Sequence, residues 1–536
     1  MKYILNFLFL IWLVPLLGFS QEKKPKPNWQ NLDLQADGIP GMSTEKAYEK
    51  LLMGKTGQSV VVAVIDGGVD IHHEDLKDKI WMNSKEIEGD SIDNDENGYI
   101  DDVNGWNFIG NAKGKNVQYD NLEVLRLVRE LQPKYVSVLP STPLGEKERR
   151  QFLEYQKMNT DYMRKLQIAE LTERAIKEFK NHVDSIITRI DKKNPSIGEL
   201  KKYKPKNKLE RKALAMMIRG INDEGDFSKF YEDLVEGVDH YEAEVNYHLN
   251  MAYDPRSIVG DHYRDSKERY YGNADVKGPD ALHGTHVAGI IAANRANNLG
   301  IKGIADQAKI MVLRVVPDGD ERDKDVANAL FYAVDNGARV VNMSFGKAYV
   351  KDKQIVDSAV RYAMQHDVLI IHAAGNEGQD NDANANYPNR NYVDSLGLNM
   401  GVAENWIEVG ASNWKYDETL VAEFSNYGKR TVDVFAPGVA IHSTVPESKY
   451  KDEDGTSMAA PAVSGVAALI RSYYPKFTAA EVKKIILASV VKPSQKIKIV
   501  QDKAKKKVLL SDICITGGLV NAYNALQLAE KLAVDK

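Results

Sequence analysis

The chain is organised around a stretch near its C-terminal end, Asp454-Gly455-Thr456-Ser457-Met458-Ala459-Ala460-Pro461. Gly455 allows a sharp backbone turn before the serine. The small and apolar residues that continue to Ile470 predict a buried helix with Ser457 in its first turn. The unpaired N–H groups and the dipole at that end of a helix favour an anion beside the hydroxyl. Ser457 is therefore a candidate nucleophile, although a serine that only caps the helix would give a similar pattern.

Four apolar, β-branched runs predict strands that are buried on both faces. They cover residues 60–65, 310–316, 340–346 and 368–374. Predicted helices, such as the one at 325–336, alternate with them, which indicates an α/β fold with a mostly parallel central sheet. Asp66 follows the first strand, at the sheet edge where such folds place their chemistry. An acidic turn residue would explain Asp66 equally well. Asn376 lies just past the last strand.

Two histidines, His283 and His286, stand three residues apart on a further predicted helix. They suggest a metal pair as one alternative. However, the His-Glu-x-x-His spacing of zinc hydrolases is absent from the sequence, and no third ligand is evident beside them.

Four segments together resemble the signatures of the subtilisin-like serine proteases, and they occur in that family's order. They are Val-Ile-Asp-Gly-Gly at Asp66, His-Gly-Thr-His-Val-Ala-Gly at His283, Ala-Ala-Gly-Asn-Glu-Gly at Asn376 and Gly-Thr-Ser-Met-Ala-Ala-Pro at Ser457. The resemblance extends over residues 43–110 and 252–530. It implies a three-layer subtilisin-like fold and a serine endopeptidase.

The resemblance also assigns a role to each residue. Ser457 would attack the peptide carbonyl, His283 would carry the proton to the leaving amine, and Asp66 would orient the imidazole. The amide of Asn376 and the N–H of Ser457 would stabilise the oxyanion, and His286 would be structural. The segments expected to bind extended substrate are Ser344, Phe345 and Gly346 on one side and Ala373, Ala374 and Gly375 on the other. Asn386 would stand at the pocket floor, where the family usually has glycine, and would make the pocket shallower or more polar.

One departure from the family is large. Asp66 and His283 are 217 positions apart, where the family usually has a few tens. The intervening residues 119–250 are rich in Lys, Glu, Tyr and Leu, and a stripe of apolar residues from Ile176 to Ile190 steps by three and four. We therefore expect an inserted all-helical subdomain that gates the substrate cleft. A surface insertion without such a role is the alternative.

Residues 90–104 are dense in oxygen ligands, and Asp93-x-Asp95-x-Asn97-Gly98 matches the first half of a calcium loop. We expect structural calcium held by Asp93, Asp95, Asn97 and Asp101, with a solvated acidic turn as the alternative, because the final glutamate is missing. The segment 297–301 resembles the family's other calcium loop, to which Asp75 could contribute a carboxylate. No organic cofactor is expected.

Residues 1–20 hold a lysine and then an apolar run, which predicts a secretory signal peptide cut after Ser20. A membrane anchor is the alternative, but the run is short for a span. A short segment, 21–42, would precede a peptidase domain formed by 43–118 and 251–536. Cys514 is the single cysteine, so no internal disulfide is expected. With 71 basic and 76 acidic residues, the charge gives no reason to expect nucleic acid as a partner.

We therefore expect a secreted or periplasmic monomer that acts on protein or peptide substrates, without stable membrane insertion after signal cleavage. Two other classes of function stay open. One is a secreted binding or scaffold protein on the same fold, with the insert blocking the cleft. The other is a metal-dependent hydrolase built on His283 and His286, which lacks an acid-rich motif beside the histidines.

Overall fold

The computed structural model describes residues 25–394, 397–501 and 504–534, so the predicted signal peptide lies outside the described residues. The chain divides into two compact units. One unit, called here the peptidase unit, contains residues 24–123 and 255–536. The other, called here the insert, contains residues 124–254. The insert thus begins and ends within five residues of the boundaries that composition predicts.

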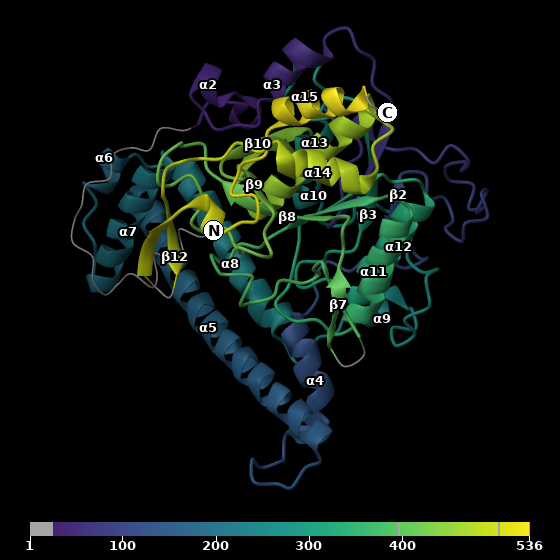
Figure 1. The fold of residues 1–536 in the computed structure, drawn as a ribbon. Coiled ribbons are helices and arrows are strands. Elements are labelled where there is room, and N and C mark those ends of the chain that lie inside the picture. The colour runs from purple at the N-terminus through teal and green to yellow at the C-terminus, as the bar shows by residue number, and fades with distance from the viewer. Residues whose placement is uncertain (1–24, 395–396, 502–503, 535–536) are drawn as a thin grey trace. The chain divides into compact units, whose positions relative to one another are not determined.

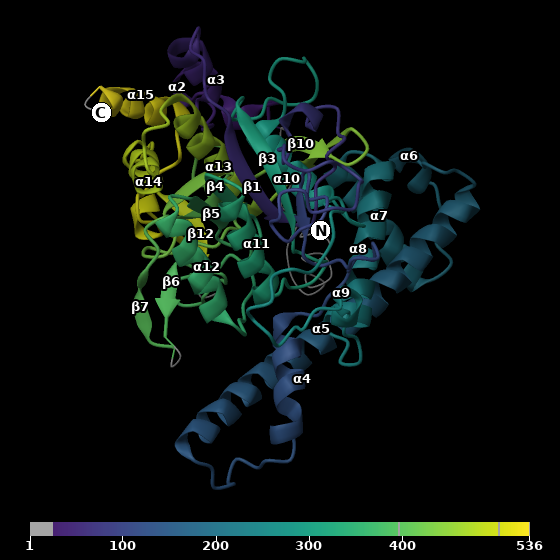
Figure 2. The same ribbon diagram turned by 90° about the vertical axis from the view of Figure 1, so that its right-hand side faces the viewer.

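The peptidase unit is built on a seven-stranded sheet with the order β2-β3-β1-β4-β5-β8-β9. Neighbouring strands are parallel at each of its six pairings. The strands are β1 (Val60–Asp66), β2 (Gly105–Asn107), β3 (Ala308–Arg314), β4 (Val340–Met343), β5 (Leu369–Ala373), β8 (Trp406–Ser412) and β9 (Val434–Pro437). The strand predicted at 340–346 ends at Met343 instead, so the backbone from Ser344 onward lies outside the sheet. Figure 2 shows β1 beside β3.

Helices cover both faces of this sheet, which confirms the predicted three-layer fold (Figure 1). Side chains alternate along β1, so that Val62 and Val64 pack on one face and Ala63 and Ile65 on the other. The helices are α10 (Leu282–Ala292), α13 (Thr456–Tyr473), α14 (Ala479–Ala488) and α15 (Ala522–Ala533) on the first face, and α11 (Asp323–Asp335) and α12 (Lys353–Gln365) on the second.

Smaller elements complete the peptidase unit. Three antiparallel hairpins pair β6 (Asn391–Val393) with β7 (Asn399–Val402), β10 (Ile441–Val445) with β11 (Lys449–Glu453), and β12 (Ile497–Gln501) with β13 (Ala504–Val508). Short helical turns are η2 (Trp29–Asn31), α2 (Leu34–Asp37), α3 (Thr44–Ala47), η3 (Tyr48–Leu52), η4 (Lys77–Lys79), α9 (Arg256–Val259) and η6 (Leu510–Asp512).

The segment predicted as a separate N-terminal piece, 21–42, contributes to the core of the peptidase unit. Trp29 is 1 % exposed, and its indole N–H donates to the carbonyls of Val439 and Ala440 at 3.1 and 3.3 Å. Met42 is fully buried in the same cluster. The polar composition of this segment conceals these two apolar residues, which is why composition alone separates it from the domain.

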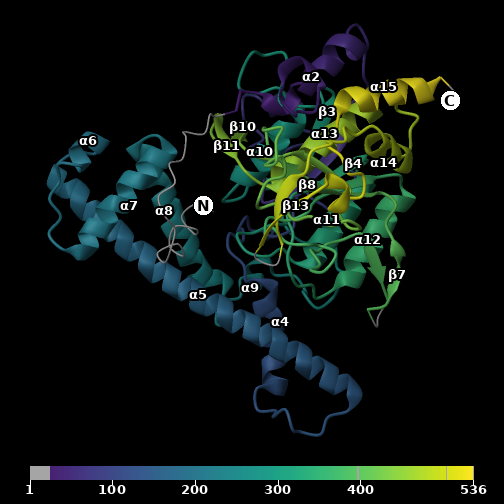
Figure 3. The ribbon, with the colours of Figure 1, turned by 60° about the vertical axis from the view of Figure 1, so that its left-hand side comes forward.

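The insert is helical in its described residues, as predicted. It contains α4 (Glu123–Tyr135) from the second residue of that helix onward, and then α5 (Glu146–Ile190), α6 (Ile197–Leu200), α7 (Lys208–Glu224), α8 (Phe227–Ala243) and η5 (Glu244–His248). Figure 3 shows α5 as a long helix with α7 and α8 beside one end. The predicted stripe forms the core there, since Ile176, Val183 and Ile186 are fully buried against α7 and α8. In the described part of the chain, no helix combines the length and apolarity that a membrane span requires.

Candidate active site

Asp66 and His283 meet at the carboxyl edge of the sheet. Asp66 ends β1, and His283 is the second residue of α10. The imidazole Nδ1 lies 2.8 and 3.0 Å from the two carboxylate oxygens of Asp66, whose side chain is nearly buried. Gly284 makes this approach possible, because a Cβ at that position would lie only 2.2 Å from the Gly68 carbonyl oxygen. The close contact of helix and strand therefore depends on a glycine beside the histidine.

Ser457 is the second residue of α13, so it lies at the helix start that the sequence predicts. Together with His283 and Asn376 it lines a cavity of about 230 Å³. The serine hydroxyl donates to the carbonyl of Ser344 at 2.9 Å, and the Ser344 hydroxyl donates to the carbonyl of Ser457 at the same distance. These reciprocal bonds tie the nucleophile to the segment expected to bind substrate.

Asn376 is oriented by Thr456, the residue before the candidate nucleophile. Its Oδ1 accepts from the backbone N–H of Thr456 at 2.9 Å and from the threonine hydroxyl at 3.1 Å. A backbone N–H can only donate, so this contact identifies the oxygen of the amide and leaves the Nδ2 group as the donor. The sequence does not reveal this role of Thr456, since a threonine before a serine carries no signal of its own.

The two histidines of α10 have opposite electrostatic environments. Burial lowers the pKa of His286 to about 3, and its Nε2 lies 3.1 Å from the Lys451 carbonyl, so it is a neutral, fully buried residue. Burial also acts to lower the pKa of His283, but the Asp66 carboxylate more than offsets it, and the pKa is raised. The side chain of His283 is 43 % exposed. Only His283 is thus placed to exchange protons with a substrate.

The two predicted walls of the substrate pocket lie on opposite sides of Asn386. A Cβ on Gly346 would lie 2.5 Å from the Asn386 Oδ1, and the Asn386 Nδ2 donates to the carbonyls of Ala373 and Ala374 at 3.2 Å each. The asparagine side chain therefore occupies the space between the walls, as expected for a pocket floor that is not glycine.

A family model described as the subtilase family matches residues 57–511, which is most of the chain. The chain belongs to the subtilase family. It is 40 % identical over 191 residues to the thermophilic serine proteinase of Bacillus sp. (strain AK1), which covers 35 % of this chain and 42 % of that protein. It is 37 % identical over 195 residues to the major intracellular serine protease of Bacillus subtilis (strain 168), and the match covers 36 % of this chain and 55 % of that protein.

Thermitase from Thermoactinomyces vulgaris is 34 % identical over 246 residues, covering 46 % of this subtilase and 75 % of thermitase. The chain spans about half the length of the first curated relatives it matches.

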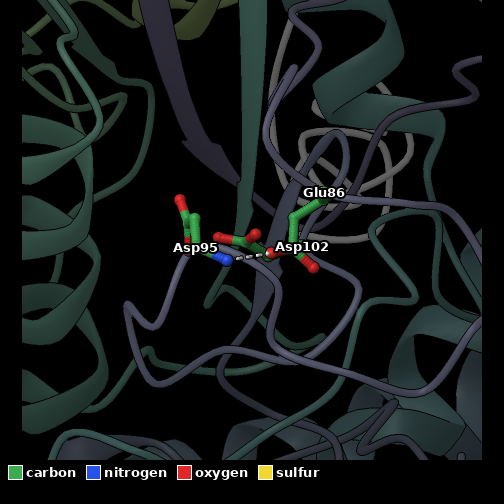
Figure 4. A group of neighbouring side chains, drawn as sticks. All are labelled: Glu86, Asp95 and Asp102. Atoms are coloured by element: carbon green, nitrogen blue, oxygen red, sulfur yellow. Dashed lines mark hydrogen bonds between the residues drawn. The ribbon is translucent and has the colours of Figure 1, made fainter.

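The acidic loop of this subtilase gathers a different set of carboxylates from the one predicted. Among the described residues, oxygens of Glu86, Asp95 and Asp102 lie within 4.8 Å of one another (Figure 4). Asp95 is one of the four predicted calcium ligands, whereas Glu86 and Asp102 are not among them. Glu86 lies before the Asp-rich motif, so the sequence pattern does not point to it. Its carboxylate accepts N–H bonds from Asn94, Asp95 and Asp101.

The other predicted ligands shape the same loop. The Asp93 carboxylate accepts the N–H groups of Asn97 and Gly98, and the Asp101 carboxylate accepts those of Gly89 and Ser91. The Asn97 amide donates to Asp102 at 2.9 Å. Burial raises the pKa of Asp102 to about 6.

The second loop expected to bind calcium brings its predicted partners together. The Asn297 amide donates to the carboxylate of Asp75 at 2.7 Å, and the N–H of Ile301 lies 3.4 Å from the other carboxylate oxygen. Asp75 is nearly fully buried.

Proposed function

We propose that this subtilase is a serine endopeptidase that hydrolyses peptide bonds in protein or peptide substrates through an acyl-enzyme intermediate. The observation that carries the proposal is that Ser457, His283 and Asn376 line one cavity, while the Asp66 carboxylate bonds to Nδ1 of the His283 imidazole. A binding protein would not require this combination. A metal hydrolase using His283 and His286 is disfavoured, because burial keeps His286 neutral and bonded to a carbonyl.

The chemistry follows from these positions. The Ser457 oxygen attacks the peptide carbonyl while His283 Nε2 takes the hydroxyl proton, which it then gives to the leaving amine. Water attacks the acyl-enzyme by the same proton path, and Asp66 stabilises the imidazolium that forms in each step. The serine hydroxyl bonds to Ser344 in this structure, so it must turn to the imidazole when substrate binds.

The oxyanion is proposed to be stabilised by Asn376 Nδ2 and the backbone N–H of Ser457. The orientation of the Asn376 amide by Thr456 supports this role, because a donor that is already aimed needs no reorganisation during the reaction. The N–H of Ser457 lies in the first turn of α13, where backbone donors have no partner within the helix.

Hydrolysis of a fluorogenic peptide by purified variants tests the proposed function. Ser457→Ala and His283→Ala should abolish turnover while the thermal unfolding transition stays in place. His286→Ala is the matched control on the same helix, and it should mainly lower the melting temperature. Equal losses of activity from the two histidine variants, with unchanged melting, would overturn the assignment.

Substrate is proposed to bind as an extended chain along Ser344, Phe345 and Gly346. Main-chain pairing reads little sequence, so selectivity would come from the pocket between Gly346 and Ala373. Asn386 fills part of that space, which favours small or polar side chains before the cleaved bond. Asn386→Gly should therefore extend cleavage to large apolar side chains, and an unchanged cleavage pattern in a peptide library would contradict this.

We also propose that the acidic loop binds a structural calcium ion. Calcium takes six to eight oxygen ligands, and Glu86, Asp95 and Asp102 offer three carboxylates close enough to share one ion. The residues present therefore fit the ion that the sequence predicts. Calcium would crosslink the loop and would take no part in the reaction.

The proposed setting is outside the cytoplasm, secreted or periplasmic, as a monomer. The predicted signal peptide supports it, and N-terminal sequencing of the mature protein would test the cut after Ser20. A mature chain that begins at Met1 would count against secretion. Sedimentation velocity would test the monomer.

The insert is proposed to gate access of large substrates to the site. Glu123, the last residue of the peptidase unit before the insert, forms an ion pair with Lys347, the residue after Gly346. The attachment point of the insert thus lies beside the substrate-binding segment, which supports a role in access.

A further inference from the structure

Five consecutive charged residues are buried at the start of α11. The run is Glu321-Arg322-Asp323-Lys324-Asp325, called here the charged clasp, and its residues are between 0 and 5 % exposed. A run of alternating charges ordinarily lies on a solvated surface, because burying a charge is costly unless it is paired. The ion-pair partners of the charged clasp therefore show which segments of the chain it connects.

The partners come from both segments that flank the insert. On the side before the insert, the Arg322 guanidinium makes two bonds to Asp120, at 2.7 and 2.9 Å. On the side after it, Asp325 accepts two bonds from Arg256, at 2.6 and 2.9 Å. The Lys324 ammonium lies 2.8 Å from the carboxylate of Asp261, which also follows the insert. One short segment of the peptidase unit is thus bonded to the chain on both sides of the insert.

The same clasp also holds Lys347. The Lys347 ammonium is about 1 % exposed and lies 2.8 Å from Asp323 and 3.1 Å from Glu123, and it donates to the Glu321 carbonyl at 2.7 Å. Glu123 is the residue from which the insert begins. A single buried ammonium therefore joins the clasp, the attachment point of the insert and the segment that follows β4.

The backbone of Lys347 pairs with the residue that follows the proposed pocket floor. Its N–H and carbonyl pair with the carbonyl and N–H of Tyr387, each at 2.9 Å. Gly346, on one side, belongs to the proposed substrate-binding segment, and Asn386, on the other, is the proposed pocket floor. Any shift of Lys347 would therefore move both sides of the pocket together.

We propose that Lys347 is a positioning residue for substrate, which fixes the segment 344–347 through Glu123 and the charged clasp. The inference rests on the proposed endopeptidase function. Loss of the buried ammonium would leave the carboxyl groups of Glu123, Asp323 and Glu321, which lie 3.1, 2.8 and 3.9 Å from it, without their shared cation. The segment would then move away from its productive position. Chemistry at Ser457 should depend less on this segment than substrate binding does, because the serine hydroxyl must leave the Ser344 carbonyl in order to attack. His283 and Asn376 are held by Asp66 and Thr456, which lie outside the segment.

The test compares Lys347→Met and the milder Glu123→Gln with Asp120→Asn in the full-length protein. Asp120→Asn is the matched control, because it breaks an equally buried pair, with Arg322, on the same flank of the insert. For an extended peptide substrate, Lys347→Met and Glu123→Gln should raise KM about tenfold or more, since small displacements of positioning groups cost up to about 10²-fold. Fluorophosphonate labelling uses the triad and the oxyanion donors but no extended peptide, so its rate should stay within about twofold.

A second readout does not depend on activity. Amide hydrogen exchange should accelerate at Lys347 and Tyr387 in Lys347→Met and Glu123→Gln, and should stay as in wild type in Asp120→Asn. Unchanged KM and unchanged exchange in a folded Glu123→Gln variant would overturn the proposal, as would an equal rise of KM in Asp120→Asn. A wild-type protein that neither cleaves peptide nor reacts with fluorophosphonate would instead refute the endopeptidase function, and the exchange experiment would still decide the role of Lys347.

Discussion

His283 and His286 share a helix but differ in solvent contact, and this difference separates catalysis from stability. Both histidines line the cavity, but the side chain of His283 is 43 % exposed and is held by Asp66, while His286 is fully buried with its Nε2 beside a backbone carbonyl. A base must be neutral to accept the serine proton. Because the pKa of His283 is raised above its usual 6.5, kcat/KM should fall on the acid side with an apparent pKa above 6.5.

The buried His286 gives a prediction for stability against pH. Its pKa is about 3 in the folded protein and about 6.5 when unfolded, so the unfolded state binds more protons between these values. The free energy of unfolding should therefore decrease by about 1.4 kcal/mol per pH unit as the pH falls from 6.5 toward 3. Urea unfolding from pH 7 to pH 4 would measure this, with His286→Gln as control. The same pH slope in that variant would show that other groups are responsible.

Asn376 gives the second prediction at this scale. Asn376→Ala should lower kcat about 10²–10³-fold and leave KM nearly unchanged, because the oxyanion exists only after attack. Thr456→Val should reproduce part of the loss, since it removes the hydroxyl that bonds to the Asn376 oxygen. Steady-state kinetics of both variants would test this. A change confined to KM would speak against an oxyanion donor.

Single residues also show what local sequence patterns can and cannot place. Asp66, His283, Asn376 and Ser457 each follow a strand or begin a helix, so local patterns place them at the same edge of the sheet. Glu86 could not be found in this way, because it reaches the acidic loop only through the fold. Lys347 was hidden for a similar reason, since its partners lie far away in the sequence.

At the scale of elements, the strands were predictable because each is a short β-branched run buried on both faces. The boundary between the peptidase unit and the insert was harder to predict. The predicted domain piece 119–250 begins with residues that the peptidase unit buries, notably Asp120 and Glu123. Charged residues are usually exposed to solvent, so the sequence places Asp120 and Glu123 on the surface. They are buried because each forms an ion pair, Asp120 with Arg322 and Glu123 with Lys347.

The acidic loop carries a prediction at the element scale. Calcium that binds only the folded state should stabilise by about 2.7 kcal/mol at a concentration 100 times its Kd, so chelation should lower the melting temperature. Asp95→Asn should abolish this response, while Asp37→Asn, which changes a carboxylate in another part of the unit, should retain it. Identical melting curves with and without calcium would remove the ion from this loop.

At the scale of the whole molecule, the prediction concerns the insert. The test replaces residues 124–254 by a short Gly/Ser linker. Removal from residue 119 onward would also delete Asp120 and Glu123, which belong to the peptidase unit. If the insert gates access, the shortened enzyme should cleave folded proteins faster relative to small peptides, because only bulky substrates meet the gate. The ratio of the two rates is the measurement, with the melting temperature as the control for folding. An unchanged ratio in a stable protein would refute gating.

The central claim is that Ser457 is a nucleophile activated by His283. Intact-mass and peptide mass spectrometry after treatment with a fluorophosphonate tests it most directly. We expect one adduct per chain, located on Ser457, absent in Ser457→Ala and formed far more slowly in His283→Ala. Adduct formation on another residue, or labelling of Ser457→Ala at the wild-type rate, would contradict the account.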